Sequence, residues 1–521
     1  MQKFIARHRP LVSCVLSGFD RLVFRGSLRH LRSPRGIYGV LDRAGVRQVD
    51  FGQFAEHTTE RVIEAALKEA KTQKRPILFL ESSRLRKEDV AREFLQKHPL
   101  EGPGLICALE AVEPCMRFVY HRSADPQERG FRLKPSKCKH IYKYYRHPTF
   151  GFMHLRLQTY LPFDVQICMN GREWLATQLA ARGSEFERAD NCFTRLADPV
   201  LAQQLMEEQL RTAWSEMLDG LLASIHPLHS EIFRTSPMSY WWVGYQTEWA
   251  TDLLFKDAGA LAQLYPALVR HAVDHFKSPD VIRFLGKHER QSWSRDIHSS
   301  FSERCEGVRV KHWLNGNSVK MYDKASQILR VETTIGNPRD FSVLRPRTGE
   351  EGGGDQSKLA WLNMRKSVAD LHRRAEISQR SNERYLDALA VVDETTPCSR
   401  HFDAVSRPVV DDGRRFRALR LHDRADLDLL EAVSRGEFVT SGFRNRDLRR
   451  LVYAEPKTEK DARQLSGKVS RFLRLLRAHG LIRKVQNSHR YHLTERGRLL
   501  TAALRATRDA NIQRLLSLAA A

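Results

Sequence analysis

The sequence predicts a multidomain α+β protein, and three observations support this class. First, 521 residues are too many for one ordinary hydrophobic core, so two to four domains are expected. Second, strand and helix patterns alternate near the N-terminus, and an antiparallel meander follows a helical middle. Third, the C-terminus has the pattern of three helices and a β-hairpin. We expect an α/β region at 1–185, helices and the meander at 186–346, a linker and long helix at 347–420, and a separate domain at 421–521.

The N-terminal region contains short apolar runs separated by amphipathic segments. Residues 11–16 and 22–24 are predicted to form a hairpin around the Ser-Gly-Phe-Asp sequence at 17–20. A buried strand at 76–80 lies between two helical segments, and further strands are expected at 150–160 and 163–169. This alternation predicts an α/β arrangement for the region.

The segment 199–290 is predicted to be mainly helical, and it contains a group of aromatic residues. These are Tyr240, Trp241, Trp242, Tyr245 and Trp249. Such rings stack on unpaired bases in some nucleic-acid-binding proteins, but they more often form a hydrophobic core. A core role is therefore favoured for this group.

The region from 307 to 345 changes to a strand pattern. Strands are expected at 308–314, 318–324 and 329–335, with a tight turn at Asn315-Gly316. The glycine-rich stretch 347–357 is the clearest linker in the chain. A long amphipathic helix at about 358–392 and a second polar linker at 393–420 complete the expected order.

The charge of the chain indicates a polyanionic partner. There are 86 Lys and Arg against 62 Asp and Glu, giving a net charge of +24 and a pI of about 9.9. Phosphates release condensed counterions when basic side chains bind them, so nucleic acid is the expected ligand. The alternative is a basic surface that binds only nonspecifically.

Several other classes are not supported by the sequence. The eight cysteines are scattered without a CxxC pair, which indicates free thiols in a reducing compartment. No apolar run has the roughly 18 residues that span a bilayer, and the N-terminus does not resemble a signal peptide, so a cytoplasmic protein is expected. Walker, GxGxxG and GxSxG motifs are absent, which leaves ATP-driven and hydride-transfer chemistry without support.

The C-terminal domain shows the most informative pattern. Thr458 and Asp461 form a capping box that starts a helix ending near Gly480, after two shorter helices. One arc of this helix is apolar, and the opposite face is expected to contact DNA through Arg463, Ser470, Arg474 and Arg477. A basic β-hairpin follows, with Arg483, Lys484 and Arg490 as further expected contacts.

The sequence YHLTERGR at 491–498 resembles the YxLTxxGR close of MarR- and PadR-like winged helices. This resemblance covers about a sixth of the chain and implies a winged helix-turn-helix that binds duplex DNA. Residues 441–521 hold 19 basic against 6 acidic residues, a net of +13, which agrees with that role. A winged helix used for protein contacts is the alternative.

The meander contains a second resemblance. Residues 317–332 are similar to the S-x-x-[RK]-x-Y-D-K…R-[VI]-E segment of rolling-circle replication initiators of plasmids and filamentous phages. Those proteins nick single-stranded DNA with a tyrosine and a divalent metal. The resemblance implies Tyr322 and Glu332 as catalytic residues, Glu332 as a ligand of Mg²⁺ or Mn²⁺, and Lys320, Lys324 and Arg330 as phosphate contacts. The alternative is a solvated strand face with cross-strand ion pairs.

The His-hydrophobic-His strand of those initiators is absent from this sequence. The nearest pattern places His154, Arg156 and Gln158 on one strand face, where they are candidates for binding a metal or a phosphate. Upstream, the KCKHIYKYY sequence alternates basic and aromatic residues, so Lys137 and Tyr142 are candidate contacts for a single nucleic-acid strand. A half-buried β-strand gives the same alternation and is the alternative.

Asp20 is part of an alternative carboxylate site. Its position on the first predicted hairpin allows it to act with Asp164 and Glu173 in an arrangement similar to RNase H. Acidic residues near turns are common, which weighs against this set.

Together these patterns predict a nucleic-acid-binding protein of the mobile-element or replication type, with DNA or structured RNA as partner. The expected activity is metal-dependent nicking of single-stranded DNA, with the winged helix anchoring a duplex. An RNA-bound effector and a DNA-binding transcription regulator without catalytic activity remain as alternatives. The sequence leaves the oligomeric state open.

Overall fold

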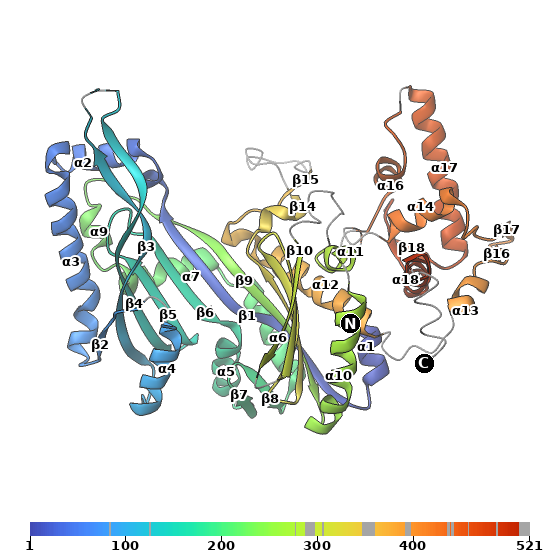
Figure 1. Cartoon of the computed structure of the whole chain (residues 1–521), viewed down its shortest axis with the longest axis horizontal. Helices are drawn as coiled ribbons and strands as arrows, with labels where there is room; N and C mark the ends of the chain where they lie inside the picture. Colours follow the sequence, from blue (N-terminus) through green and yellow to red (C-terminus); the bar gives the residue numbers. More distant parts are fainter. Residues whose placement is uncertain are drawn as a thin grey trace.

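The computed structural model describes residues 1–82, 85–123, 125, 127–276, 278–286, 297–304, 307–345, 360–390, 398–434, 438, 442–456, 458–485 and 488–509. Within these residues, one 11-stranded sheet has the order β10-β11-β12-β13-β9-β1-β6-β5-β4-β3-β2. Strand β2 runs parallel to β3, and the other neighbours are antiparallel. This mixed sheet with helices on its faces forms the body of the protein (Figure 1).

One half of the sheet begins with a long central strand and returns to it through a meander. Its elements are β1 (Val12–Leu28), α2 (Pro34–Arg43), α3 (Phe51–Thr72), β2 (Ile77–Leu80), α4 (Lys87–Lys97), β3 (Gly104–His121), β4 (Gly130–His147), β5 (Gly151–Gln158), β6 (Val165–Asn170) and α5 (Gly171–Ala181). The last strand of the meander, β6, pairs with β1.

The other half follows the same path. Its elements are β9 (Tyr240–Phe255), α10 (Ala258–His275), α11 (Ser278–Phe284), β10 (Ile297–Arg304), β11 (Gly307–Leu314), β12 (Asn317–Lys324), β13 (Ile328–Ile335), β14 (Ser342–Arg345), β15 (Ala360–Asn363) and α12 (Leu371–Leu389). Strand β13 returns to pair with β9, and β9 pairs antiparallel with β1. The two halves are therefore related by an approximate two-fold axis between β1 and β9.

Between the halves lie β7 (Phe186–Ala189), β8 (Cys192–Leu196), α6 (Pro199–Glu208), α7 (Trp214–Gly220), α8 (Leu222–Ile225) and α9 (His229–Ile232), and α1 (Gln2–His8) precedes β1. Helix α6 packs closely on β1 at Gly18, where an added Cβ would lie 2.0 Å from the Met206 side chain. Helices α5 and α6 lie on one face of the sheet and cover one end of it. On the same face, α4 covers strands β3–β5.

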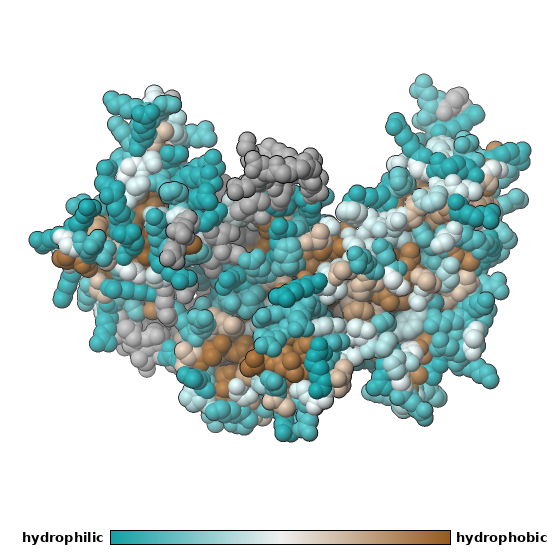
Figure 2. Space-filling model, turned by 180° about the vertical axis from the view of Figure 1, so that it is seen from behind, coloured by the Kyte–Doolittle hydropathy of each residue, from teal (hydrophilic) through white to brown (hydrophobic). Residues whose placement is uncertain are grey.

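The opposite face of the sheet carries the main hydrophobic core. Phe19, Leu22 and Trp249 join residues of α3, α7 and α12 in the largest buried cluster. A second cluster places α1, α10 and α12 against β9 and β11–β13. Helices α4–α6 cover only part of the other face of the sheet. That face is therefore available for polar residues. From behind the view of Figure 1, hydrophilic residues cover most of the visible surface (Figure 2).

The C-terminal elements pack around a hydrophobic cluster of their own, with members from Val405 to Leu504. They are α13 (Cys398–Asp403), β16 (Val409–Asp411), β17 (Arg414–Phe416), α14 (Arg424–Val433), α16 (Asn445–Val452), α17 (Glu459–Ala478), β18 (Ile482–Lys484), β19 (Tyr491–Leu493) and α18 (Glu495–Asp509). The predicted bounds of the long helix are confirmed, because the Thr458 side chain accepts a hydrogen bond from the Asp461 amide and the helix ends before Gly480.

Two predicted elements are wrong. The expected hairpin at 11–24 is one continuous strand, β1, because its residues pair with β9 along almost their whole length. The segment 240–255, expected within a helical region, is the central strand β9. Its β-branched and aromatic residues alternate between two faces, which is the period of a strand.

Other expectations are met in part. Helix α12 starts at Leu371, after the short strand β15, whereas the sequence pattern predicts a start near 358. The predicted linker at 347–357 lies outside the described residues. Among the helices that the structure describes, none has the length and apolar character needed to span a bilayer.

Candidate active site

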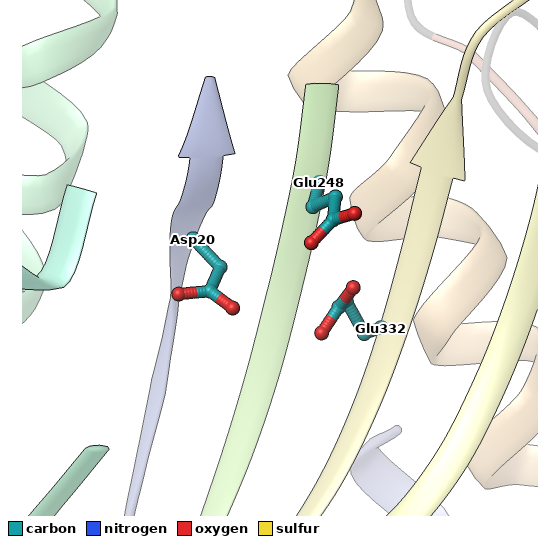
Figure 3. Close-up of side chains that lie close together, drawn as sticks. All are labelled: Asp20, Glu248 and Glu332. Carbon is teal, nitrogen blue, oxygen red and sulfur yellow. The ribbon is translucent and has the colours of Figure 1, made fainter. Parts of the chain in front are cut away.

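Three carboxylates from adjacent strands meet near the middle of the sheet. Asp20 lies on β1, Glu248 on β9 and Glu332 on β13, and one oxygen of each lies within 4.8 Å of the others. Asp20 and Glu248 stand at the centres of the two strands that flank the approximate two-fold axis. Figure 3 shows the three side chains directed toward one another. We call this group the carboxylate cluster.

A bulge in β1 turns Asp20 toward the cluster. In the β1–β9 ladder, Phe19 pairs with Trp249 and Leu22 with Thr247, so three steps along β1 match two along β9. The extra residue keeps both Phe19 and Leu22 in the hydrophobic core while Asp20 faces away from it. Without the bulge, one of these side chains would change faces.

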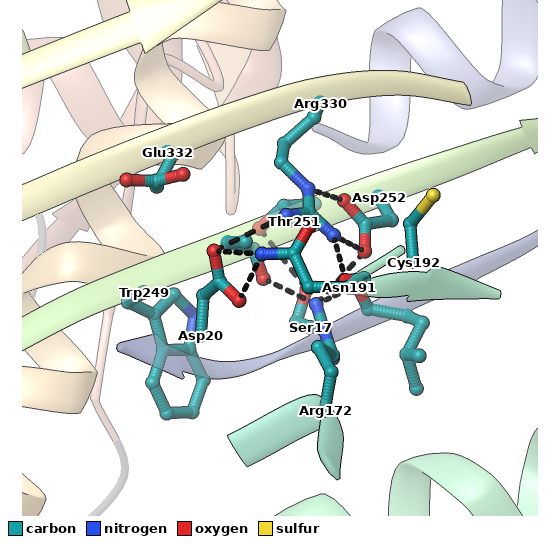
Figure 4. A network of polar contacts seen from close by, with 12 residues as sticks. Ser17, Asp20, Arg172, Asn191, Cys192, Trp249, Thr251, Asp252, Arg330 and Glu332 are labelled. Atoms are coloured by element: carbon teal, nitrogen blue, oxygen red, sulfur yellow. Dashed lines mark hydrogen bonds and ion pairs between the residues drawn. The ribbon is translucent and has the colours of Figure 1, made fainter. Parts of the chain in front are cut away.

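Two amides and a guanidinium hold Asp20 in place, and Figure 4 shows Asn191 and Arg330 beside it. The side-chain amides of Asn170 and Asn191 donate to Oδ1 of Asp20 at 2.9 and 2.8 Å, and Asn191 also reaches Oδ2 at 3.0 Å. Arg330 donates to Oδ2 at 3.2 Å. Because Asp20 is only 3% exposed, these donors replace the water that a carboxylate would otherwise bind.

Arg330 belongs to a buried ion network that extends beneath the cluster. Its Nη2 donates to Asp252 at 2.8 Å, and Arg172 lies 3.0 Å from the same carboxylate. Burial opposes ionisation of Asp252, but the two guanidinium groups outweigh it and hold its pKa below the usual range. Arg330 is fully buried and occupied by these partners, so it stabilises the site and does not contact a phosphate.

Glu332 connects the cluster to Tyr322 and Lys320. The Tyr322 hydroxyl donates to Oε2 at 3.0 Å, and Lys320 Nζ lies 2.6 Å from Oε1. Burial disfavours the charge on Glu332, but Lys320 and then Arg330 keep its pKa below the usual range. Burial, followed by the charge of Glu332, raises the pKa of Tyr322 well above its ordinary value. The phenol is therefore protonated and directed at a carboxylate.

The anionic form of Glu248 is disfavoured in this site. Burial and then the neighbouring charge of Glu332 raise its pKa to about 8. The Gln246 amide donates to Glu248 Oε1 at 2.8 Å, which supplies one partner for the carboxyl group. Near neutral pH the Glu248 carboxyl group thus holds a proton, first because it is buried and second because Glu332 is close to it.

This arrangement fits a divalent cation. Three carboxyl groups supply only oxygen atoms, which are the ligands that Mg²⁺ and Mn²⁺ prefer. The raised pKa of Glu248 marks a place where added positive charge would be stabilised. Asp20, Glu248 and Glu332 are the residues that would hold the ion.

The proton on Glu248 predicts how metal affinity depends on pH. Because the group is protonated below a pKa of about 8, a cation must displace the proton in that range. We expect affinity for Mn²⁺ to rise about tenfold per pH unit from pH 6 to 7.5 and to level off above pH 8. Calorimetric titration in two buffers of different ionisation enthalpy measures the affinity and the released proton.

The Glu248→Gln variant is the control for this titration. It removes the titrating group, so the remaining affinity should vary little over the same pH range. An equal slope in the variant and the wild type would contradict the assignment of the proton to Glu248.

The other predicted contacts of the meander are placed as follows. Lys320 and Tyr322 lie on the cluster side of β12, as the two-residue period predicted. Lys324 is buried and pairs with Asp190 at 2.9 Å, which leaves it as a structural contact in this conformation.

The candidate residues on β5 are already engaged within the protein. His154 is buried, and burial lowers its pKa to about 3. Arg156 pairs with Glu113 at 3.0 Å, and the Gln158 amide donates to the carbonyls of Met116 and Tyr160. A metal or phosphate site at these residues is not supported, because their polar groups are buried or have protein partners.

The structure also contradicts the prediction that the Tyr142 ring stacks on a single nucleic-acid strand. Tyr142 is buried and donates to Glu113 at 2.8 Å, because α4 covers this part of β4. Lys137 is exposed on β4. The alternating basic and aromatic residues of the KCKHIYKYY sequence are thus the pattern of a half-buried strand.

The sequence patterns identified Asp20 and Glu332 as candidates, but in two different sites and without Glu248. The sequence pattern grouped Asp20 with Asp164 and Glu173, but these two pair with Arg32 and Arg188. Glu248 was missed. Its signal is a carboxylate between the buried residues Thr247 and Trp249 on a strand, which is visible only once the segment is recognised as a strand.

In the C-terminal elements, the arginines of α17 are directed away from the core. Arg463, Arg474 and Arg477 are exposed, whereas Val469, Phe472, Leu473 and Leu476 are buried. Ser470 accepts a hydrogen bond from Asn445 at 2.8 Å. Arg483 and Lys484 are exposed on β18, and Arg490 is half-buried before β19.

Comparisons of the chain with protein-family models, curated proteins and solved structures find no match. The two resemblances noted in the sequence therefore stand on the motifs alone.

Proposed function

We propose that the protein is a metal-dependent enzyme that cleaves single-stranded DNA at the carboxylate cluster, with Tyr322 as the nucleophile. The observation that carries this proposal is the hydrogen bond from Tyr322 to Glu332, because it places a phenol beside three converging carboxylates. The resemblance of residues 317–332 to rolling-circle initiators supports the same assignment.

In the proposed reaction, the Tyr322 oxygen forms a bond to phosphorus, and the bond from phosphorus to a deoxyribose oxygen breaks. The phenolic proton passes to Glu332, which already accepts its hydrogen bond. The leaving oxygen takes a proton from solvent, so the products are a phosphotyrosine and a free hydroxyl. A divalent ion at the cluster would polarise the phosphoryl oxygen and stabilise the charge of the transition state.

Lys320 assists by its charge. It lies beside Glu332 and at 5.4 Å from the Tyr322 ring, so it offsets negative charge on the approaching phosphate. Arg330 and the two asparagines orient Asp20 and are positioning residues.

The C-terminal elements are proposed to act as a winged helix that anchors duplex DNA. Helix α17 would lie in the major groove, and the β18–β19 hairpin would contact the backbone. What supports this role is the exposed basic face of α17 and the excess of basic residues after 441.

A cleavage assay with end-labelled oligonucleotides tests the proposal. Full-length protein with Mn²⁺ or Mg²⁺ should cut single-stranded DNA and remain attached to one product, and EDTA should abolish both signals. Sequencing of nucleic acid that co-purifies with the protein identifies the natural ligand. Absence of cleavage on all single-stranded and duplex DNA tested would refute the enzyme. Structured RNA in the purified complex would then favour the RNA-bound effector, and one palindromic duplex would favour the regulator.

The proposed winged helix predicts a specific salt dependence. Replacing Arg463, Arg474 and Arg477 by Gln removes up to three charges that face phosphates, so the slope of log K against log salt should fall by about one unit per phosphate. Fluorescence anisotropy on a duplex at a series of salt concentrations measures this slope. The matched control is Arg195→Gln, an exposed arginine on β8, which should leave the slope unchanged. Equal slopes for all proteins would contradict the assignment.

A further inference from the structure

We propose that the open face of β1 and β9 beside the carboxylate cluster binds single-stranded nucleic acid, with Trp241 and Tyr245 as stacking rings and Arg25 and Arg29 as phosphate contacts. This surface is called the stacking track below. The inference rests on the proposed function, and it names the surface that would hold the strand next to Tyr322.

Two exposed rings on β9 are each covered on one side by an arginine, Arg25 from β1 and Arg29 from the turn that follows β1. The guanidinium carbon of Arg25 lies 3.3 Å from the centroid of Tyr245, and that of Arg29 lies 3.3 Å from the centroid of Trp241. Trp241 is 39% exposed and Tyr245 is 42% exposed. Large aromatic side chains on a strand are normally buried. Two exposed rings on one strand, each with a cationic partner, therefore distinguish this surface from the rest of the sheet.

The register places the stacking track on the same face of the sheet as the carboxylate cluster. Val23 pairs with Gln246 and Phe24 with Gly244, so one step on β1 matches two on β9. This bulge puts Tyr245 and Gln246 on one face, and Gln246 contacts Glu248 there. Trp241 lies two residues before Val243 on β9. The two-residue period of a strand directs both side chains to this same face of the sheet.

The other aromatic residues of β9 serve a different purpose. Trp242 donates to Asp219 of α7, and Trp249 donates to Gln379 of α12, so both are fixed in the core. Gly244 packs against Leu371 and Arg374 of α12. The helix-covered face of β9 thus provides the core expected from the aromatic group, while Trp241 and Tyr245 are left for another role.

The charge of the track suits phosphates. Arg25 and Arg29 are both exposed, and neither forms an ion pair with a carboxylate among the described residues. The Nε of Arg25 donates a long hydrogen bond of 3.5 Å to Gln166, which leaves its terminal N–H groups for a phosphate. Stacking on a ring limits the motion of each guanidinium while its N–H groups at the edge stay available for a phosphate oxygen. Less side-chain entropy is then lost when the ligand binds.

An unpaired strand fits better than a duplex. Rings of this kind bind bases by their faces, which are accessible only when the bases are unpaired. Trp241 and Tyr245 are four residues apart, or about 13 Å along the strand, and Tyr245 is about 10 Å from Glu248. A strand on the track would span a site of at least about four nucleotides and lead into the cluster.

The experiment measures binding separately from cleavage. Full-length protein is titrated with fluorescein-labelled oligothymidylate in EDTA, where no cleavage is expected. Trp241→Ala and Tyr245→Ala should each weaken binding by about fivefold to 100-fold. Arg29→Gln should weaken it and reduce the salt slope by about 0.7, the value for one phosphate of a single strand.

The control is Phe79→Ala, which removes a ring that is 55% exposed on β2 at the far edge of the sheet. Its affinity should equal that of the wild type. Duplex binding should be unchanged in all these variants, because the proposed anchor for duplex lies in the C-terminal elements. Circular dichroism checks that each variant keeps its fold.

The outcomes separate this inference from the proposed function. Weaker oligothymidylate binding in the Trp241 and Tyr245 variants supports the track even if no DNA is ever cleaved. Cleavage by the wild type together with unchanged binding in both variants would overturn the track and leave the enzyme intact. Equal weakening by Phe79→Ala would also overturn it, because the effect would then not be specific to the track.

Discussion

Replacing Tyr322 by Phe is expected to reduce metal-dependent cleavage of single-stranded DNA by at least about 10³-fold and to eliminate the covalent protein–DNA product. The variant keeps the ring between its neighbours but removes the proposed nucleophilic oxygen. Gel analysis of the labelled oligonucleotide, with and without protease treatment, detects the cut and the attached protein. Mn²⁺ affinity should change little, because the phenol is outside the carboxylate cluster.

Two further variants make the Tyr322 result specific. Tyr120→Phe removes a hydroxyl from β3 at a distance from the cluster and should cleave as the wild type does. Glu332→Gln should lose cleavage as well, but for a different reason, because it removes both a proposed metal ligand and the proposed acceptor of the phenolic proton. Cleavage by Tyr322→Phe with a covalent product intact would assign the nucleophile to another residue.

Replacing Arg330 by Gln is expected to destabilise the body by about 3–5 kcal/mol. The change leaves Asp252 and Asp20 buried with fewer positive partners, since Arg330 is fully buried and bonds to both. Tryptophan fluorescence during denaturation with urea is a suitable measurement. All eight tryptophans precede the C-terminal elements, so the signal reports on the body.

The matched control for this measurement is Arg195→Gln, in the body. The Arg195 side chain is 65% exposed and lies 3.1 Å from Glu187, so its removal should change stability by less than about 0.5 kcal/mol. Arg330→Lys should recover part of the stability, since it restores the charge without the fork that contacts two carboxylates. A stability of Arg330→Gln equal to that of the wild type would show that the network is not required for folding.

The carboxylate cluster and the ion network beneath it have opposite electrostatic characters. The network pairs Asp252 with Arg330 and Arg172, and its charges are balanced and closed to solvent. In the cluster, burial and then the charge of Glu332 raise the pKa of Glu248 to about 8, so this carboxyl group is protonated near neutral pH. A carboxyl group with a raised pKa near a tyrosine hydroxyl has the electrostatic features of a functional site.

Local patterns in the sequence predicted several elements correctly. The capping residue Thr458, the apolar arc of α17 and the Asn315-Gly316 turn each depend on residues close together in the chain, and the structure has them where expected. Lys320, Tyr322 and Glu332 were named because residues 317–332 resemble the initiator segment, and they lie together because β12 and β13 are neighbours in both sequence and space. Their mutual positions follow from the period of a strand.

The partners of Asp20 could not be predicted in this way. Glu248 is distant in the sequence, and it meets Asp20 only because β1 and β9 pair across the middle of the sheet. A local pattern specifies which residues share a face of a strand, but not which other strand lies beside it. The hairpin expected at 11–24 is an example, since the bulge at Asp20 resembles a turn when β9 is not known.

The sequence alone therefore determined the charge and the basic C-terminal helix, because these depend on composition and on short-range periodicity, and the resemblance of residues 317–332 pointed to Tyr322 and Glu332. Only the tertiary structure decided that Asp20, Glu248 and Glu332 form one cluster and that Trp241 and Tyr245 lie on the same face of the sheet. The physical reason is that pairing between distant strands and the bulges within it set the orientation of these side chains. Such pairing is stabilised by the whole sheet and not by any one segment.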